Sequence, residues 1–230
     1  KTRAAYDSAN NKTVISFADG DDSAGKGDAV VGTISGTSIS FGSSVRFETG
    51  AISHSGIAYD SDTGKVVIAY RQNTSGGSTD NKRGTAVVGT VSGDTISFGT
   101  PVAFDNAGDY GENTANSVIY DSFAKKVLVV YPRTLSGSYS NRGIVFPLKD
   151  GAFDVAGATA VYPAISFDSN VNRNLIAFGD AGNSEYATAV SYRPASTTLT
   201  SENYIGILSG NVSTTGGPSG GKDSTWSATE

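Results

Sequence analysis

Acidic side chains in one short stretch are the first residues of this chain that suggest chemistry. Asp19, Asp21, Asp22 and Asp28 are close together in a segment expected to connect two strands. Carboxylate oxygens are the ligands that Ca²⁺ prefers, which makes Asp19, Asp21 and Asp22 candidate calcium ligands. Their spacing does not match an EF-hand loop, and no other cofactor is expected.

Carboxylates and arginines elsewhere in the chain could in principle form a glycosidase or sialidase site. Hydrolysis of a glycosidic bond requires two carboxyl groups that face each other, and nothing in the sequence pairs the available residues Glu48, Glu112, Glu185 and Glu202. A sialidase-like site requires converging arginines, but the candidates lie at different positions of their repeats: Arg71, Arg133 and Arg193.

Nucleophilic and thiolate chemistry have little support. The sequence contains no cysteine, and its single histidine, His54, is expected to be solvated in a linker between repeats, Gly50–Gly56. The single Gly-x-Ser-x-Gly match, at 217–221, lies in the Gly/Ser/Thr-rich tail and does not support a nucleophile elbow. We therefore expect a protein without catalytic residues.

One short phrase occurs four times: Tyr6-Asp7-Ser8, Tyr59-Asp60-Ser61, Tyr120-Asp121-Ser122 and Phe167-Asp168-Ser169. A base and then a second aromatic residue follow at constant distances each time. The repeated Asp and base suggest a site, but a catalytic site is usually singular. We favour a structural interpretation, in which the Asp accepts hydrogen bonds from the turn backbone and the base pairs with it across the turn.

The elements that carry this phrase are predicted to be β-hairpins. Apolar β-branched runs, such as Val66-Val67-Ile68-Ala69, flank each polar turn. The units recur about every 50 residues, which is typical of propeller blades. The predicted fold is all-β, a β-propeller-like array of about four four-stranded repeats within residues 1–208, with units at about 4–50, 56–107, 117–160 and 164–208.

Composition sets further limits. The net charge of −5 provides no basic surface for nucleic acid or an anionic membrane, and no segment is long and apolar enough for membrane insertion. Residues 209–230 form a Gly/Ser/Thr-rich tail in which 224–228 are a candidate terminal strand. The chain starts inside a repeat at Lys1, which suggests a processed chain or part of a longer protein.

The segments that differ between units are the expected place for ligand binding. They include 72–83, 135–142 and 181–186, and the candidate binding residues in or beside such connections are Tyr110, Tyr139, Tyr186 and Arg71. Exposed aromatic rings next to polar residues suit sugar or protein surfaces. The alternative is that these rings only pack the loops against the body.

The sequences of the repeats also resemble those of a known family. AYDSDTGKVVIAYR (58–71), GTAVVGTVSG (84–93), TISFGTPVAF (95–104) and LTSENYIGI (199–207) are similar to repeats in tail-fibre-like structural proteins of tailed bacteriophages, especially marine and environmental ones. The resemblance covers about residues 4–210 and departs from the family after Ile207. It implies a propeller-like or related β-repeat body on a virion or extracellular fibre, and it carries no catalytic residues.

The resulting functional hypothesis is a structural or adhesin module of a phage tail fibre or similar virion appendage. We expect it at a virion surface or outside the cell, assembled as a homo-oligomer or with other fibre proteins, where its loops recognise host surface glycan or protein. Two alternatives stay open: a subunit of a cellular extracellular filament or surface layer, and a propeller-type carbohydrate-active enzyme.

Overall fold

The computed structural model describes residues 2–20, 25–73, 82–105, 116–135, 138–146, 152–155, 160–180, 186–192 and 204–208. These residues form strands and turns with no helix among them, so the predicted all-β class is confirmed. The candidate terminal strand at 224–228 lies outside the described residues.

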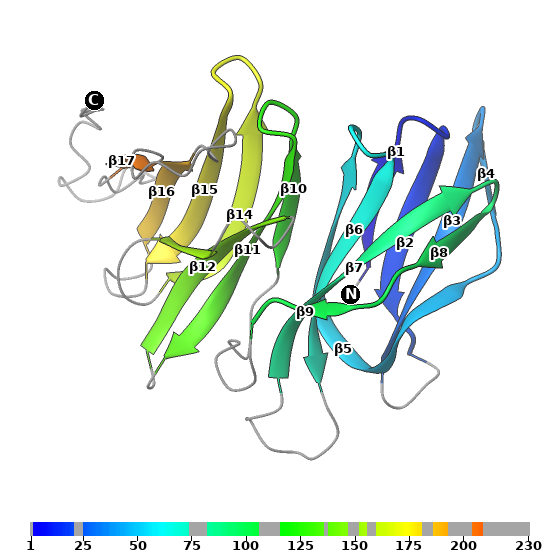
Figure 1. Cartoon of the computed structure of the whole chain (residues 1–230), viewed down its shortest axis with the longest axis horizontal. Helices are drawn as coiled ribbons and strands as arrows, with labels where there is room; N and C mark the ends of the chain where they lie inside the picture. Colours follow the sequence, from blue (N-terminus) through cyan, green and yellow to red (C-terminus); the bar gives the residue numbers. More distant parts are fainter. Residues whose placement is uncertain are drawn as a thin grey trace.

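The strands form four layers (Figure 1). The first layer contains β1 (Arg3–Asp7), β2 (Lys12–Ala18), β3 (Lys26–Ser35), β4 (Ser38–Phe41) and the first part of β5 (Val45–Asp60). The second contains the rest of β5 with β6 (Lys65–Asn73), β7 (Lys82–Ser92), β8 (Thr95–Phe98) and β9 (Val102–Ala103). The third contains β10 (Ser117–Asp121), β11 (Lys126–Leu135), β12 (Ser138–Phe146) and β13 (Ala152–Val155), and the fourth β14 (Ala160–Asp168), β15 (Arg173–Asp180), β16 (Tyr186–Tyr192) and β17 (Tyr204–Leu208).

Strand β5 joins the first two layers into one nine-stranded sheet. Its first part pairs with β3, and from Ala51 onward it pairs with β6. Register shifts, including one between Ser53 and Gly56, allow the strand to turn from one layer to the next without leaving the hydrogen-bonded ladder. The expectation that Gly50–Gly56 is a linker outside the strands is therefore wrong.

The repeated phrase forms the predicted hairpins. In all four units the Asp pairs with the base five positions later in an antiparallel register, as Asp7 does with Lys12. The Asp side chain accepts hydrogen bonds from the turn backbone, as predicted: Oδ1 of Asp7 is 3.0 Å from the Ala9 nitrogen and 3.1 Å from the Asn10 nitrogen. The residue before each base has a positive φ, and three of the four are Asn or Gly.

The bases have a different role from the one predicted. Lys12 Nζ lies 2.7 Å from the carboxylate of Asp94 in the second layer, and Lys65 Nζ donates to the Thr90 hydroxyl on β7. The expected pairing of base and Asp across the same turn is therefore wrong for these two lysines. The Lys12–Asp94 ion pair instead connects neighbouring layers, and its hydrogen bond lowers the pKa of Asp94.

The core lies between the layers, which pack face to face as open sheets. Strand β6 is buried on both faces, from Val66 to Tyr70, as its uninterrupted apolar run predicted. Backbone spacing between layers is close at Gly56, where an added Cβ would lie 2.5 Å from Val118 of the third layer.

Candidate functional site at the loop end of the layers

The layers have two different ends. The four Asp-containing turns lie at one end, at the top of Figure 1, and the opposite strand ends form what we call the loop end. Strands β2 and β6 finish at the loop end, and β12 and β16 start there. Because antiparallel strands alternate in direction, the connections between second and third strands all belong to this end.

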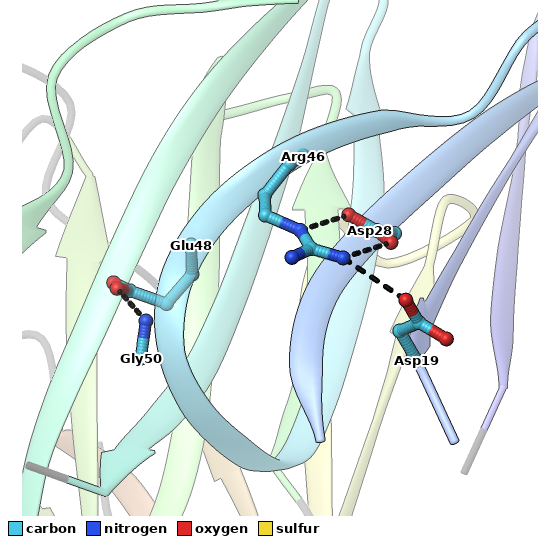
Figure 2. A network of polar contacts seen from close by, with 5 residues as sticks. All are labelled: Asp19, Asp28, Arg46, Glu48 and Gly50. Atoms are coloured by element: carbon cyan, nitrogen blue, oxygen red, sulfur yellow. Dashed lines mark hydrogen bonds and ion pairs between the residues drawn. The ribbon is translucent and has the colours of Figure 1, made fainter. Parts of the chain in front are cut away.

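Arg46 is the centre of a charged cluster at the loop end of the first layer (Figure 2). Its guanidinium forms two parallel bonds to Asp28, with Nε at 2.9 Å from Oδ1 and Nη2 at 3.0 Å from Oδ2. The same Nη2 lies 2.9 Å from Oδ2 of Asp19. Arg46 thus neutralises both carboxylates and ties β5 to the base of the connection between β2 and β3.

This arrangement bears on the predicted calcium ligands. Asp19 is engaged by Arg46 and its backbone nitrogen donates to the Lys26 carbonyl, whereas Asp21 and Asp22 lie outside the described residues. Among the described residues, no group of three or more His, Cys, Asp or Glu side chains gathers to hold a metal. Calcium binding stays a prediction.

Glu48 lies close to this cluster, on β5, and is almost fully buried. Its Oε1 accepts the Gly50 N–H at 2.8 Å, and its Oε2 accepts the Tyr70 hydroxyl and the Gln72 amide at 2.9 Å each. Burial, followed by the charge of Glu48, raises the pKa of Tyr70, so the phenol stays protonated and donates. These three donors share one buried carboxylate, which holds β5 and β6 together.

A small pocket lies next to these clusters, lined by Ala18, Ile52, Ser53, His54 and Ser55. His54 is half-buried in β5 with φ of 55°, so it is not the solvated linker residue that was expected. Hydroxyl groups and an imidazole in one pocket can bind a small polar ligand through hydrogen bonds.

Arg71 lies in strand β6, and its side chain is buried rather than displayed in a loop. Its Nε donates to Oδ1 of Asn73 at 2.9 Å, and the Asn73 amide is 3.4 Å from the Ser53 hydroxyl that lines the pocket. Arg71 therefore supports the pocket from the neighbouring strand, and ligand binding by this residue stays a prediction.

The three tyrosines proposed for ligand binding are only partly placed. Tyr139 pairs with Thr134 in the hairpin of β11 and β12, and Tyr186 is the first residue of β16, opposite Asp180. Both belong to strands at the loop end, while Tyr110 lies outside the described residues.

Sequence reasoning missed the Arg46 cluster, although the repeats contain a signal for it. Arg46 and Asp28 stand where the second unit has Ala103 and Thr85, so a charged pair replaces small neutral residues at one register position. Two residues that differ from the other unit and contact each other indicate a role that the other unit does not share.

Comparison with known proteins yields a fold likeness alone. No protein family and no curated protein matches the sequence. Among solved structures, the chain is similar to an exo-β-1,3-galactanase from Phanerochaete chrysosporium crystallised with β-1,3-galactotriose, with a TM-score of 0.52 and 11% identity over 88% of this chain. The match covers 49% of the galactanase chain, so the present chain spans about half the length of that enzyme.

Among the described residues, no helix is long and apolar enough to cross a bilayer.

Proposed function

We propose that this chain is a propeller-like β-repeat module of a tail-fibre-like virion appendage that binds host surface glycan through its loop end. The propeller arrangement is supported by the stack of antiparallel layers, in which each unit begins with the same turn. The virion role rests on the resemblance of the repeats to tail-fibre-like proteins. A virion role implies a location outside the host cell, where the module would meet surface polysaccharide.

The binding role rests on which polar groups at the loop end already have hydrogen-bond partners within the protein. Asp19, Asp28 and Glu48 are engaged by Arg46 and by neutral donors, which makes them structural residues. The group that we propose for recognition is the small pocket with the hydroxyls of Ser53 and Ser55 and the imidazole of His54. The galactanase of similar fold was crystallised with a trisaccharide, which supports carbohydrate as the ligand class.

The test is binding of the full chain to an array of immobilised bacterial surface glycans and, in solution, to β-1,3-galactotriose. We expect weak binding to at least one glycan without chain cleavage, and loss of that binding in the variants Tyr186→Ala or Ser53→Ala. The control Phe123→Ala changes an exposed ring at the turn end and should bind as the wild type does. Absence of glycan binding, or equal binding by all variants, would contradict the proposal.

A second candidate is a carbohydrate-active enzyme, favoured by the name of the galactanase of similar fold. This candidate predicts release of galactose from β-1,3-galactotriose, detectable by chromatography, and loss of release in Glu48→Gln without loss of folding. The binding module predicts no release, and it predicts that Glu48→Gln lowers stability because the variant loses a buried carboxylate with three donors.

A further inference from the structure

Each described layer has two faces with distinct composition. We call the face toward the preceding layer the back face and the face toward the following layer the front face. In the second layer, the back face carries Ile68, Tyr70, Val87, Val91 and Ile96, which pack on Val14, Ala29, Val31 and Phe47 of the first layer.

Apolar contacts of the same order recur at the next two interfaces, and Phe104 of the second layer packs on Tyr131 as Phe47 packs on Tyr70. Val129 and Tyr131 of the third layer pack on Ala69 and Ala86 of the second. Ile176, Phe178 and Val190 of the fourth layer pack around Val130 of the third. All three internal interfaces therefore join a back face to a front face, in the same order along the chain.

The back face of the first layer carries the same residue types, and none of the described layers covers it. Segments 29–41 and 86–98 are nearly identical in sequence, so Ile34 and Ile39 correspond to Val91 and Ile96. Ile34 is 56% exposed against 7% for Val91, and Ile39 is 47% exposed against 2% for Ile96. Phe41 and Tyr6 on the same face are also exposed, whereas Ile15, Phe17 and Val30 on it are half-buried, so part of an apolar back face meets solvent.

The front face of the fourth layer is its complement. Its described side chains are mostly small, with Arg173 and Leu175 as large exceptions, and Leu175 is 43% exposed. Ser166 and Ala187 on this face are exposed, and Ala177 and Ala189 are half-buried. These residues alternate along β14, β15 and β16 with the buried residues of the back face.

The turns of neighbouring layers also contact each other, through a tyrosine of one layer and an aspartate of the preceding layer. Tyr59 lies beside Asp7 of the preceding layer, and burial, followed by the Asp7 carboxylate, raises the pKa of Tyr59. Tyr120 lies in the same way beside Asp60 and Asp62 of the second layer. Tyr6 has no preceding layer in this structure, and Asp168 is exposed because no layer follows it.

We propose that the back face of the first layer binds the front face of the fourth layer of a second copy of this chain, head to tail, so that Tyr6 of one copy reaches the Asp168 turn of the other. The contact continues an interface that the chain already forms three times. The chain's own fourth layer is separated from its first by two intervening layers, at the opposite end of the stack (Figure 1). A heterologous contact of this kind produces a ring or an open filament.

Sedimentation of the full chain over a concentration series tests the association. We expect wild-type chains to associate and Phe41→Asp to weaken association about tenfold or more, because a charge would be buried without a partner. The matched control is Phe123→Asp, which places the same charge at another exposed ring, 44% against 56% exposed, away from both faces. Equal effects of the two substitutions, or a wild type that stays monomeric, would overturn the proposal.

Cross-linking tests the head-to-tail geometry. Across the second and third layers Lys125 Nζ lies 2.8 Å from the Asp62 carboxylate, and the repeat equivalents of these residues are Asn11 and Asn170. The chain has no cysteine, so Asn11→Cys and Asn170→Cys can each be labelled alone. A short bis-maleimide should join a mixture of the two single variants into dimers and the double variant into longer oligomers.

The outcomes separate the alternatives. Cross-linked dimers from Asn11→Cys alone would indicate back face against back face, and cross-linking within one chain of the double variant would indicate closure by its own fourth layer; either result overturns the proposal. The association rests on the layer interfaces and not on the proposed glycan, so loss of glycan binding in Tyr186→Ala with unchanged sedimentation leaves it intact.

Discussion

Asp7 and Asp168 occupy the same position in their turns but have different surroundings. Asp7 is fully buried, because the second layer covers it, and it accepts hydrogen bonds from Ala9 and Asn10. Asp168 accepts a bond from Asn170 in an exposed turn. The same local sequence therefore produces a turn cap that is either buried or solvated, according to the layer that follows.

This difference predicts a different response to acid. Although burial raises the pKa of Asp7, its hydrogen bonds with Asn10, Tyr59 and Ala9 outweigh it, and the pKa lies below the ordinary 3.8. A lowered folded-state pKa contributes stability that is complete above the unfolded value and is lost as pH falls through the folded value. Asp7→Asn should therefore lower the free energy of unfolding by about 1–3 kcal/mol at neutral pH and should lose less than the wild type on acidification.

Denaturant unfolding at neutral pH and below pH 4, at fixed salt, measures the effect. Asp168→Asn is the control, with a change of about 0.5 kcal/mol or less because the site is solvated. If both variants lose the same stability, burial by the following layer does not determine the contribution of the turn carboxylate.

The strands and hairpins were predictable because their signals are local. The apolar runs on either side of a polar turn and the Asp-to-base spacing predict hairpins in all four units, and the ladders from Asp7–Lys12 to Asp168–Arg173 confirm them. Continuity of β5 was not predictable, because Gly50–Gly56 contains Gly and Ser, which usually indicate a loop. In the structure, pairing with β3 and then with β6 supplies hydrogen bonds that override this local preference.

Gly42 and Gly99 test how closely neighbouring layers approach. They are equivalent in the repeat, and each donates its N–H at 2.9 Å to the equivalent carbonyl on the third strand. A Cβ on Gly42 would lie 1.7 Å from the Asp94 carbonyl oxygen of the next layer, whereas on Gly99 it would meet nothing closer than 3.8 Å. We predict that Gly42→Ala destabilises the protein by about 1–3 kcal/mol, and Gly99→Ala by about 0.5 kcal/mol or less.

Thermal and urea unfolding of the two variants provide the measurement. Because both substitutions are Gly→Ala at equivalent positions, their effects on the unfolded chain cancel in the comparison. A smaller loss for Gly42→Ala than for Gly99→Ala would show that the two layers separate there without cost.

At the scale of the whole molecule, the faces of the layers determine which apolar residues stabilise the fold. Leu175 and Ile176 are neighbours on β15 but point to opposite faces. Ile176 is fully buried against the third layer, whereas Leu175 lies on the uncovered front face.

We predict that Ile176→Ala lowers the free energy of unfolding by about 2–5 kcal/mol, because the substitution leaves a cavity between two layers. Leu175→Ala should change it by about 0.5 kcal/mol or less when the protein is dilute. A stability loss in Leu175→Ala that grows with protein concentration would agree with a second copy covering this face, since association stabilises the folded state. A large loss at every concentration would mean that the face is already covered within one chain.

The sequence by itself determined the class, the hairpins and the Asp-capped turns of this protein, because each depends on residues a few positions apart and on the two-residue period of a strand. The tertiary structure decided which side of each strand is buried, that Lys12 pairs with Asp94 and not with its own turn, and that Arg46 joins Asp19 to Asp28. Those contacts join residues distant along the chain. The same repeated sequence therefore has different contacts in a layer at the edge of the stack and in a layer in its middle. The candidate chemistry changed at one residue for the same reason: Asp19, a predicted calcium ligand, is held by Arg46 in the fold.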